Sequence, residues 1–159
     1  DRRSVFAVIR IVEDDLQGAE IAALLQLHLD AMHEHSPPES VHALDLDALR
    51  VPQITFWSAW DGSQLAGCAA VKELGDGHGE VKSMRTAPAH LRKGVASLLL
   101  AHLIDSVRTR GWVRLSLETG SGAPFAAAHA LYARFGFTPC GPFADYQDER
   151  FSRYFTLPL

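Results

Sequence analysis

The chain has 159 residues, of which 47% are hydrophobic and 21% are charged, so we expect one packed domain over residues 1–159. The formal net charge of -4 excludes the broad basic surface that nucleic-acid binding requires, and we expect no nucleic-acid partner. No apolar run approaches the roughly 20 residues that cross a bilayer, and the first residues lack a signal-peptide pattern. We therefore expect a cytoplasmic protein with no membrane partner.

The first third of the chain predicts a strand, a helix and a short connection. Residues 4–12 are predicted to form a strand, and Asp14 and Asp15 then supply N-cap chemistry for a helix. The apolar stripe of that helix consists of Ile21, Leu24, Leu25, His28, Leu29 and Met32. Pro37 and Pro38 end the helix, and a turn-rich or helical piece follows to about Arg50.

The middle third predicts three strands. Residues 54–60 and 65–74 flank the hairpin signal Asp61-Gly62, and the glycine-rich turn 75–79 leads into a strand over 80–86. We expect these strands to form an antiparallel meander. Cys68 and Cys140 lie in apolar strand-like contexts, which favours reduced core cysteines over a disulfide.

The last third alternates helices and strands. A helix that begins near residue 95 ends at the basic, glycine-containing segment 108–111, and Val113, Leu115 and Leu117 alternate with polar residues in the next strand. A second helix over 123–135 is closed by Gly136, and strands follow at 137–142 and 153–157. The element order predicts a mixed sheet with helices packed on it.

The turn between the strand 80–86 and the helix that follows is a candidate phosphate-binding site. The first N–H groups of a helix have no intrahelical partner and lie at the positive end of its dipole, so residues 94–97 can donate to an anion. Arg92 and Lys93 add positive charge at the same place. The alternative is a plain strand-to-helix connection in which Gly94 eases the backbone.

Two motifs together resemble the GCN5-related N-acetyltransferase (GNAT) superfamily, as a small, bacterial-type, single-domain member. They are Arg92-Lys-Gly-Val-Ala-Ser-Leu-Leu and Leu131-Tyr-Ala-Arg-Phe-Gly-Phe, each of which follows a strand. The resemblance covers nearly the whole chain. It implies an α+β fold with a mixed, largely antiparallel central sheet of about seven strands, flanked by about four helices.

The resemblance also implies an enzyme that transfers the acetyl group of acetyl-CoA, its co-substrate, to a primary amine by direct attack. The cofactor would lie against Met84, Arg85, Thr86, Leu91, Arg92, Lys93, Gly94, Val95, Ala96, Ser97, Thr119 and Phe125. In the family the strand 80–86 diverges from the next one, often at a bulge, and its free edge receives the pantetheine arm and the thioester. Two positions depart from the family pattern, because Leu91 replaces the leading Gln or Arg of the signature and Phe125 replaces a common asparagine.

By the same resemblance, two residues are candidates for catalysis. Glu80 would receive the proton of the attacking amine, and Tyr132 would assist departure of the thiolate. The alternatives are a solvated strand-end glutamate and a core tyrosine. His129, one turn before Tyr132, is more typical of a structural histidine.

The resemblance implies that the acceptor site includes His33, Phe143, Asp145 and Tyr146, and carboxylate and aromatic groups suit a cationic small-molecule amine. We expect no metal ion, although His33 and His35 leave that alternative open. Two other functions stay open: a non-catalytic module that binds or senses acyl-CoA, and an acetyltransferase for protein or peptide N-termini. A homodimer is possible in this family, and the sequence does not name the acceptor.

Overall fold

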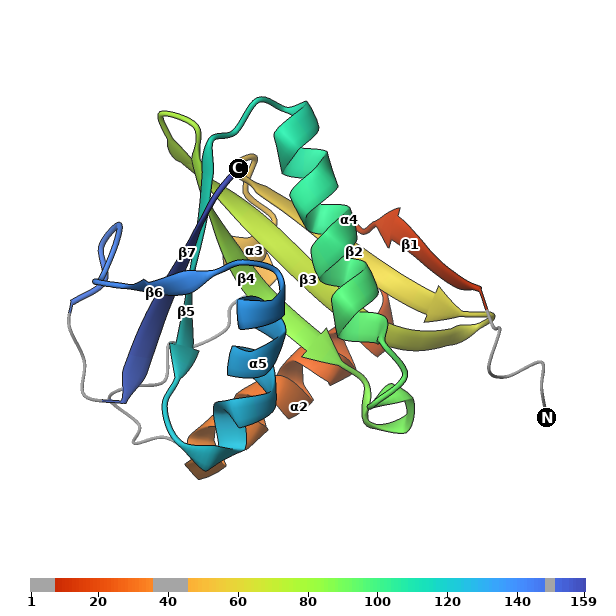
Figure 1. Cartoon of the computed structure of the whole chain (residues 1–159). Helices are drawn as coiled ribbons and strands as arrows, with labels where there is room; N and C mark the ends of the chain where they lie inside the picture. The colour runs from red at the N-terminus through yellow and green to blue at the C-terminus, as the bar shows by residue number, and fades with distance from the viewer. Residues whose placement is uncertain (1–7, 36–45, 148–150) are drawn as a thin grey trace.

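The computed structural model describes residues 8–35, 46–147 and 151–159. They form a seven-stranded mixed sheet in the order β1-β2-β3-β4-β5-β7-β6, with helices on both faces, which confirms the predicted fold class (Figure 1). The elements are β1 (Ile9–Glu13), α2 (Ala19–His35), α3 (Leu46–Leu49), β2 (Ile54–Asp61), β3 (Gln64–Gly75), β4 (His78–Thr86), the 3₁₀ turn η2 (Pro88–His90), α4 (Val95–Thr109), β5 (Arg114–Gly120), the 3₁₀ turn η3 (Ala123–Phe125), α5 (Ala126–Arg134), β6 (Thr138–Cys140) and β7 (Ser152–Pro158).

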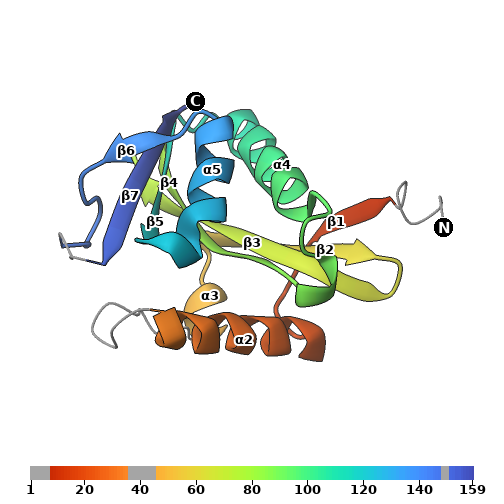
Figure 2. The same ribbon diagram turned by 60° about the horizontal axis from the view of Figure 1, so that its bottom comes forward.

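The helices divide between the two faces of the sheet. Figure 2 shows α2 and α3 on one face and α4 and α5 on the other. Apolar side chains of α4, including Leu99 and Leu103, pack into a cluster with one sheet face, and Ile21 and Leu25 of α2 pack with Phe56 on the opposite face. The predicted apolar stripe of α2 therefore supplies the surface that packs this helix on the sheet. None of the described helices is long and apolar enough to cross a lipid bilayer.

The predicted meander is confirmed, because β2 pairs antiparallel with β3 and β3 pairs antiparallel with β4. Gly62 adopts a positive φ of 60° in the first turn, as the Asp-Gly signal predicts. Both cysteines are free, and burial raises the pKa of the Cys68 thiol to about 12. Of the predicted first strand, residues 4–7 lie outside the described residues, as do Pro37 and Pro38.

Three local predictions differ from the structure. Asp14 and Asp15 accept the N–H groups of Leu16 and Gln17 in turns before α2, which begins only at Ala19. The helix predicted over 123–135 begins as the 3₁₀ turn η3, with a proline in its first turn. In β5 the predicted alternation is wrong, because Val113 precedes the strand with 61% of its surface exposed and Ser116 is buried. Ser116 is bonded to His78 of β4 at 2.7 Å and to Thr156 of β7 at 2.9 Å, so neighbouring strands bury a polar residue that the alternation assigned to the surface.

The pairing of β4 positions the site. Only residues 78–80 of β4 pair with β5, in parallel register with residues 114–116, and the two strands separate after Glu80. Opposite β3, Cys68 pairs with Arg85 and Ala70 with Lys82, so two residues of β4 face one residue of β3. This β-bulge contains Ser83, whose φ is 54°. The bulge and the divergence leave one edge of β4 open beyond Glu80.

Candidate functional site

The open edge of β4 carries backbone N–H groups. Ala87 donates its N–H to the carbonyl of Ala66 on β3 at 2.8 Å. Because N–H directions alternate along a strand, the N–H of Thr86 points away from β3, toward the gap left by β5, and that of Met84 lies on the same side. Arg85 has the opposite orientation, and its N–H contacts the thiol of Cys68. Of the three predicted edge donors, two therefore face the gap.

The turn after β4 presents the first N–H groups of α4. Arg92 and Gly94 have positive φ angles of 63° and 81°, and Gly94 is the N-cap residue, with no side-chain cap. The first intrahelical bond runs from the N–H of Leu98 to the Gly94 carbonyl at 3.1 Å. The N–H groups of residues 95–97 precede that bond and have no helical partner. Arg92 and Lys93 are exposed beside them.

The turn before α4 is held in place by the residue before Leu91 and not by Leu91 itself. The side chain of Leu91 is 56% exposed, so it offers no polar group and little packing. His90 is buried, and its Nε2 atom lies 3.1 Å from Asp61 Oδ2 in the hairpin between β2 and β3. This bond anchors η2 to the sheet. Sequence reasoning missed His90, because a single histidine before a turn carries no specific signal.

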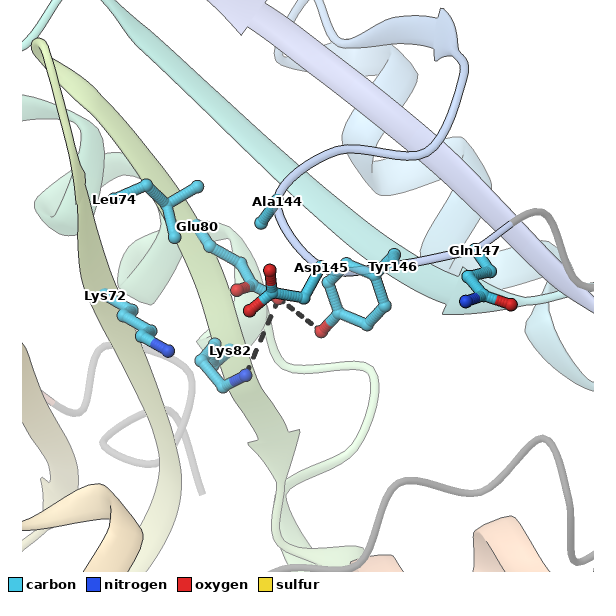
Figure 3. A pocket seen from close by; sticks show the side chains of 8 residues that line it. All are labelled: Lys72, Leu74, Glu80, Lys82, Ala144, Asp145, Tyr146 and Gln147. Carbon is cyan, nitrogen blue, oxygen red and sulfur yellow. Dashed lines mark hydrogen bonds and ion pairs between the residues drawn. The ribbon is translucent and has the colours of Figure 1, made fainter.

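Glu80 lies where β4 and β5 separate. Its side chain is buried, the Tyr146 hydroxyl donates a hydrogen bond of 2.5 Å to Oε2, and Lys82 Nζ lies 3.6 Å from the same oxygen. The three residues border a pocket of about 380 Å³ between strands β3 and β4 and the segment 144–147 (Figure 3). The pocket is lined by Lys72, Leu74, Glu80, Lys82, Ala144, Asp145, Tyr146 and Gln147. Glu80 is thus held in a pocket and is not a solvated strand end.

Tyr146 is a neutral hydrogen-bond donor in this site. Burial, followed by the negative charge of Glu80, raises its pKa far above the usual value of a tyrosine. Its ring packs against Phe143 and Tyr154 at centroid distances of 5.2 and 5.8 Å, and the Tyr154 hydroxyl donates to the Gln147 carbonyl at 2.7 Å. These contacts fix the segment 144–147 over the pocket.

The structure brings together some of the residues predicted for the acceptor site. Asp145 and Tyr146 line the pocket with Glu80, whereas Phe143 lies behind Tyr146 and supports its ring. His33 is on the last turns of α2, and its side chain lies outside the described residues. Sequence reasoning missed Lys72, because its approach to Glu80 depends on the register between β3 and β4. It also missed Lys82, although the spacing of two residues along β4 places both side chains on one face.

Tyr132 lies on the other side of the sheet from this pocket. It belongs to the apolar cluster beneath α4, where it contacts the rings of Phe137 and Phe155 at centroid distances of 5.8 and 6.3 Å. Burial raises the pKa of its hydroxyl to about 12. His129 places Nε2 2.8 Å from the carbonyl oxygen of Gly120, which explains its presence structurally.

Thr119 and Phe125 lie near the end of β5. Thr119 is half-buried and pairs with Arg153 of β7. Phe125 is half-buried at the start of α5, and its ring covers the backbone of Gly120, where a Cβ atom would overlap it. The aromatic ring that replaces the family's asparagine therefore has a packing role in this chain.

The contact between Gly120 and Phe125 predicts a measurable coupling. Gly120→Ala is expected to lower the free energy of unfolding by about 1–3 kcal/mol, because the new methyl group displaces the ring. In a Phe125→Ala background the same substitution is expected to cost much less, since the obstacle is gone. Urea denaturation of the two single variants and the double variant measures both costs. Equal costs in the two backgrounds would contradict the contact.

The model of the acetyltransferase (GNAT) family matches residues 21–137, which include β4, the turn before α4, and α5. The chain belongs to the GNAT acetyltransferase family. It is an acyltransferase enzyme, as the resemblance of its two motifs implied.

Curated relatives of this acetyltransferase extend over almost its full length. It is 56% identical to the uncharacterised N-acetyltransferase YsnE of Bacillus subtilis, over 92% of this chain and 97% of that protein. It is 53% identical to the uncharacterised N-acetyltransferase YedL of Escherichia coli, over 94% of each. An IAA acetyltransferase of Azospirillum brasilense is 36% identical over 92% of this chain and 95% of its own.

Solved structures share the fold of this GNAT acetyltransferase. A Klebsiella pneumoniae protein assigned provisionally as an acyl-CoA N-acyltransferase superposes with a TM-score of 0.77, at 29% identity over 96% of this chain and 99% of that one. A Bacillus subtilis acetyltransferase in complex with CoA has a TM-score of 0.70 at 18% identity, over 96% of this chain and 99% of its own. The second likeness concerns the fold alone.

Proposed function

We propose that this acetyltransferase moves the acetyl group of acetyl-CoA to the primary amine of a small molecule, by direct attack of the amine on the thioester. The observation that carries the proposal is the position of Glu80, buried at the point where β4 and β5 separate and open to a pocket of about 380 Å³. A carboxylate between an open strand edge and a small pocket is arranged to take a proton from a bound amine.

The turn before α4 and the edge of β4 support acetyl-CoA as the donor. The N–H groups of residues 95–97, with Lys93 and Arg92 beside them, suit a pyrophosphate. The N–H groups of Met84 and Thr86 face the gap, where they can pair with the pantetheine amides and polarise the thioester carbonyl. The bond between His90 and Asp61 keeps the turn and this edge in a fixed relation.

Two side chains, Glu80 and Tyr132, take part in the proton transfers of the proposed reaction. Glu80 accepts a proton from the ammonium form of the acceptor, and the freed lone pair attacks the thioester carbonyl carbon. The oxyanion of the tetrahedral intermediate is stabilised by strand N–H groups, after which the carbon–sulfur bond breaks. The Tyr132 hydroxyl then protonates the departing thiolate. The acceptor nitrogen loses its second proton to solvent as the amide forms, and solvent water returns a proton to Tyr132. The net reaction converts an ammonium group and acetyl-CoA into an amide, CoA thiol and one proton, which leaves Glu80 for solvent. No covalent acetyl-enzyme is needed in this sequence of steps.

The size of the pocket favours a small acceptor over a protein. A volume of about 380 Å³ lies in the range of small-molecule sites, and the segment 144–147 covers it. A peptide N-terminus would need a groove that continues beyond this segment. Release of CoA thiol in the presence of acetyl-CoA and a panel of small amines, amino acids and short peptides tests the proposal. If no acceptor accelerates thiol release above the rate of hydrolysis, the proposal is wrong.

Tyr132→Phe is expected to lower kcat about tenfold or more, with little change in the dissociation constant of acetyl-CoA, because only the proton donor is removed. The pKa of about 12 also predicts a pH profile: the tyrosine stays protonated well above pH 10, so kcat should not fall between pH 8 and 10 through loss of this proton. Phe137→Leu, which alters the packing around the same ring, is the control. An unchanged kcat in Tyr132→Phe would show that Tyr132 is not the proton donor to the thiolate.

A further inference from the structure

The pocket beside Glu80 gathers most of the lysines of the chain. The sequence contains three lysines, at positions 72, 82 and 93, whereas its other twelve basic residues are arginines. Two of the three lysines, Lys72 and Lys82, line this one pocket, and both are half-buried. Lysine ammonium groups are compact point charges that suit a single anionic group.

The sheet register places both lysines on the same face as Glu80. Lys72 of β3 is the direct cross-strand partner of Glu80, and Lys82 follows Glu80 by two residues on β4. In the view of Figure 3 both ammonium groups lie on the same side of the Glu80 carboxylate. Lys82 forms the ion pair with Glu80 at 3.6 Å. In the described part of the chain, no acidic side chain forms an ion pair with Lys72.

The charges of the described residues that line the pocket sum to zero before an acceptor binds. Lys72 and Lys82 carry two positive charges, and Glu80 and Asp145 carry two negative ones. An acceptor whose only charged group is an ammonium would add one uncompensated positive charge to a pocket that already holds two cations. Such a charge is unfavourable in a partly enclosed space away from water. An acceptor with an ammonium and an acidic group keeps the sum at zero and gives Lys72 a partner.

Resting on the function proposed above, we propose that the acceptor is an amino-acid-type small molecule, in which a carboxylate bound by Lys72 accompanies the primary amine that Glu80 deprotonates. Lys82 holds the Glu80 carboxylate in place and adds to the positive side of the pocket. Leu74 and the ring of Tyr146 provide apolar surface for the remainder of the molecule. Lys72 is thus the residue that determines specificity for a carboxylate.

The test compares acceptors that differ only in the acidic group. Thiol release is measured with saturating acetyl-CoA and with phenylalanine, methionine and leucine, each beside its amide and its decarboxylated amine. For at least one of the three sets, the wild-type kcat/KM is expected to be about tenfold or more higher for the amino acid than for the two uncharged analogues. Lys72→Met should abolish this preference while the decarboxylated amine keeps its rate, and Lys72→Arg should retain part of it.

A matched control distinguishes the effect of losing a positive charge in the pocket from the effect of a changed net charge of the protein. Arg108→Gln removes one positive charge from the exposed last turn of α4 and should leave the preference unchanged. Unchanged acetyl-CoA affinity shows that each variant is folded. If decarboxylated amines react as well as the amino acids, or if Lys72→Met lowers both rates by the same factor, the carboxylate proposal is overturned and the acetyltransferase proposal stands. If no acceptor of any class releases thiol, both proposals fail.

Discussion

Glu80→Gln is expected to lower kcat about 100-fold or more and to leave the dissociation constant of acetyl-CoA unchanged. Glutamine has nearly the same size as glutamate. In the wild type the Tyr146 hydroxyl donates a hydrogen bond of 2.5 Å to the Glu80 carboxylate, and the amide oxygen of glutamine can accept the same bond. The pocket therefore keeps its shape, and the loss is that of a group able to take a proton. Steady-state kinetics of thiol release and calorimetric titration with acetyl-CoA measure the two quantities.

The control for this variant is Glu73→Gln. Glu73 is exposed on β3, next to Lys72, the cross-strand partner of Glu80, and it does not line the pocket. The substitution Glu73→Gln therefore removes the same charge from the sheet without changing the pocket. Its kcat should stay within about twofold of the wild type, as for most exposed substitutions. A Glu80→Gln enzyme with nearly full kcat would mean that the proton leaves through water, and Glu80 would then be a structural partner of Tyr146 and Lys82.

The fold was predictable because its local signals agree with one another. The stripe on α2 predicted Ile21 and Leu25 as core residues, and both are buried. The Asp61-Gly62 turn predicted the hairpin, in which Gly62 has its positive φ. Such signals depend on spacing within a few residues of the chain, which is why a single sequence carries them. They failed at Val113, which lies just before β5, and at Ser116, which is buried by its bonds to the distant residues His78 and Thr156.

The pocket was less predictable because it depends on contacts between distant segments. Glu80 was a candidate by resemblance, but its bond to Tyr146 joins residues 66 positions apart. The bulge at Ser83, a serine with a positive φ, has no distinctive sequence signal, yet it decides which residues of β3 face those of β4. Lys72 became a candidate only once that register was known. Pairing between strands is set by the whole sheet, and local patterns do not fix it.

Gly94→Val is expected to raise the dissociation constant of acetyl-CoA about tenfold or more. Gly94 has a φ of 81° at the N-cap of α4, a conformation in which a β-branched residue is strained, so the substitution should rotate the turn and redirect the N–H groups of residues 95–97. Neither the N-cap residue nor Leu91 compensates for these N–H groups, because the N-cap residue makes no side-chain hydrogen bond and position 91 is an apolar leucine. Isothermal titration with acetyl-CoA and with CoA measures the change.

Gly111→Val is the matched control, because Gly111 follows the opposite end of the same helix with a φ of 84°. A Cβ atom at either glycine meets no atom within 4 Å, so both substitutions carry the same kind of backbone strain, about 1–2 kcal/mol, and no steric clash. Both variants should therefore lose similar stability in urea denaturation, and only Gly94→Val should lose cofactor affinity. If the two variants bind acetyl-CoA equally well, the N–H groups of this turn do not hold the pyrophosphate. Binding would then depend on Arg92 and Lys93, whose charge-removing variants would show the larger loss.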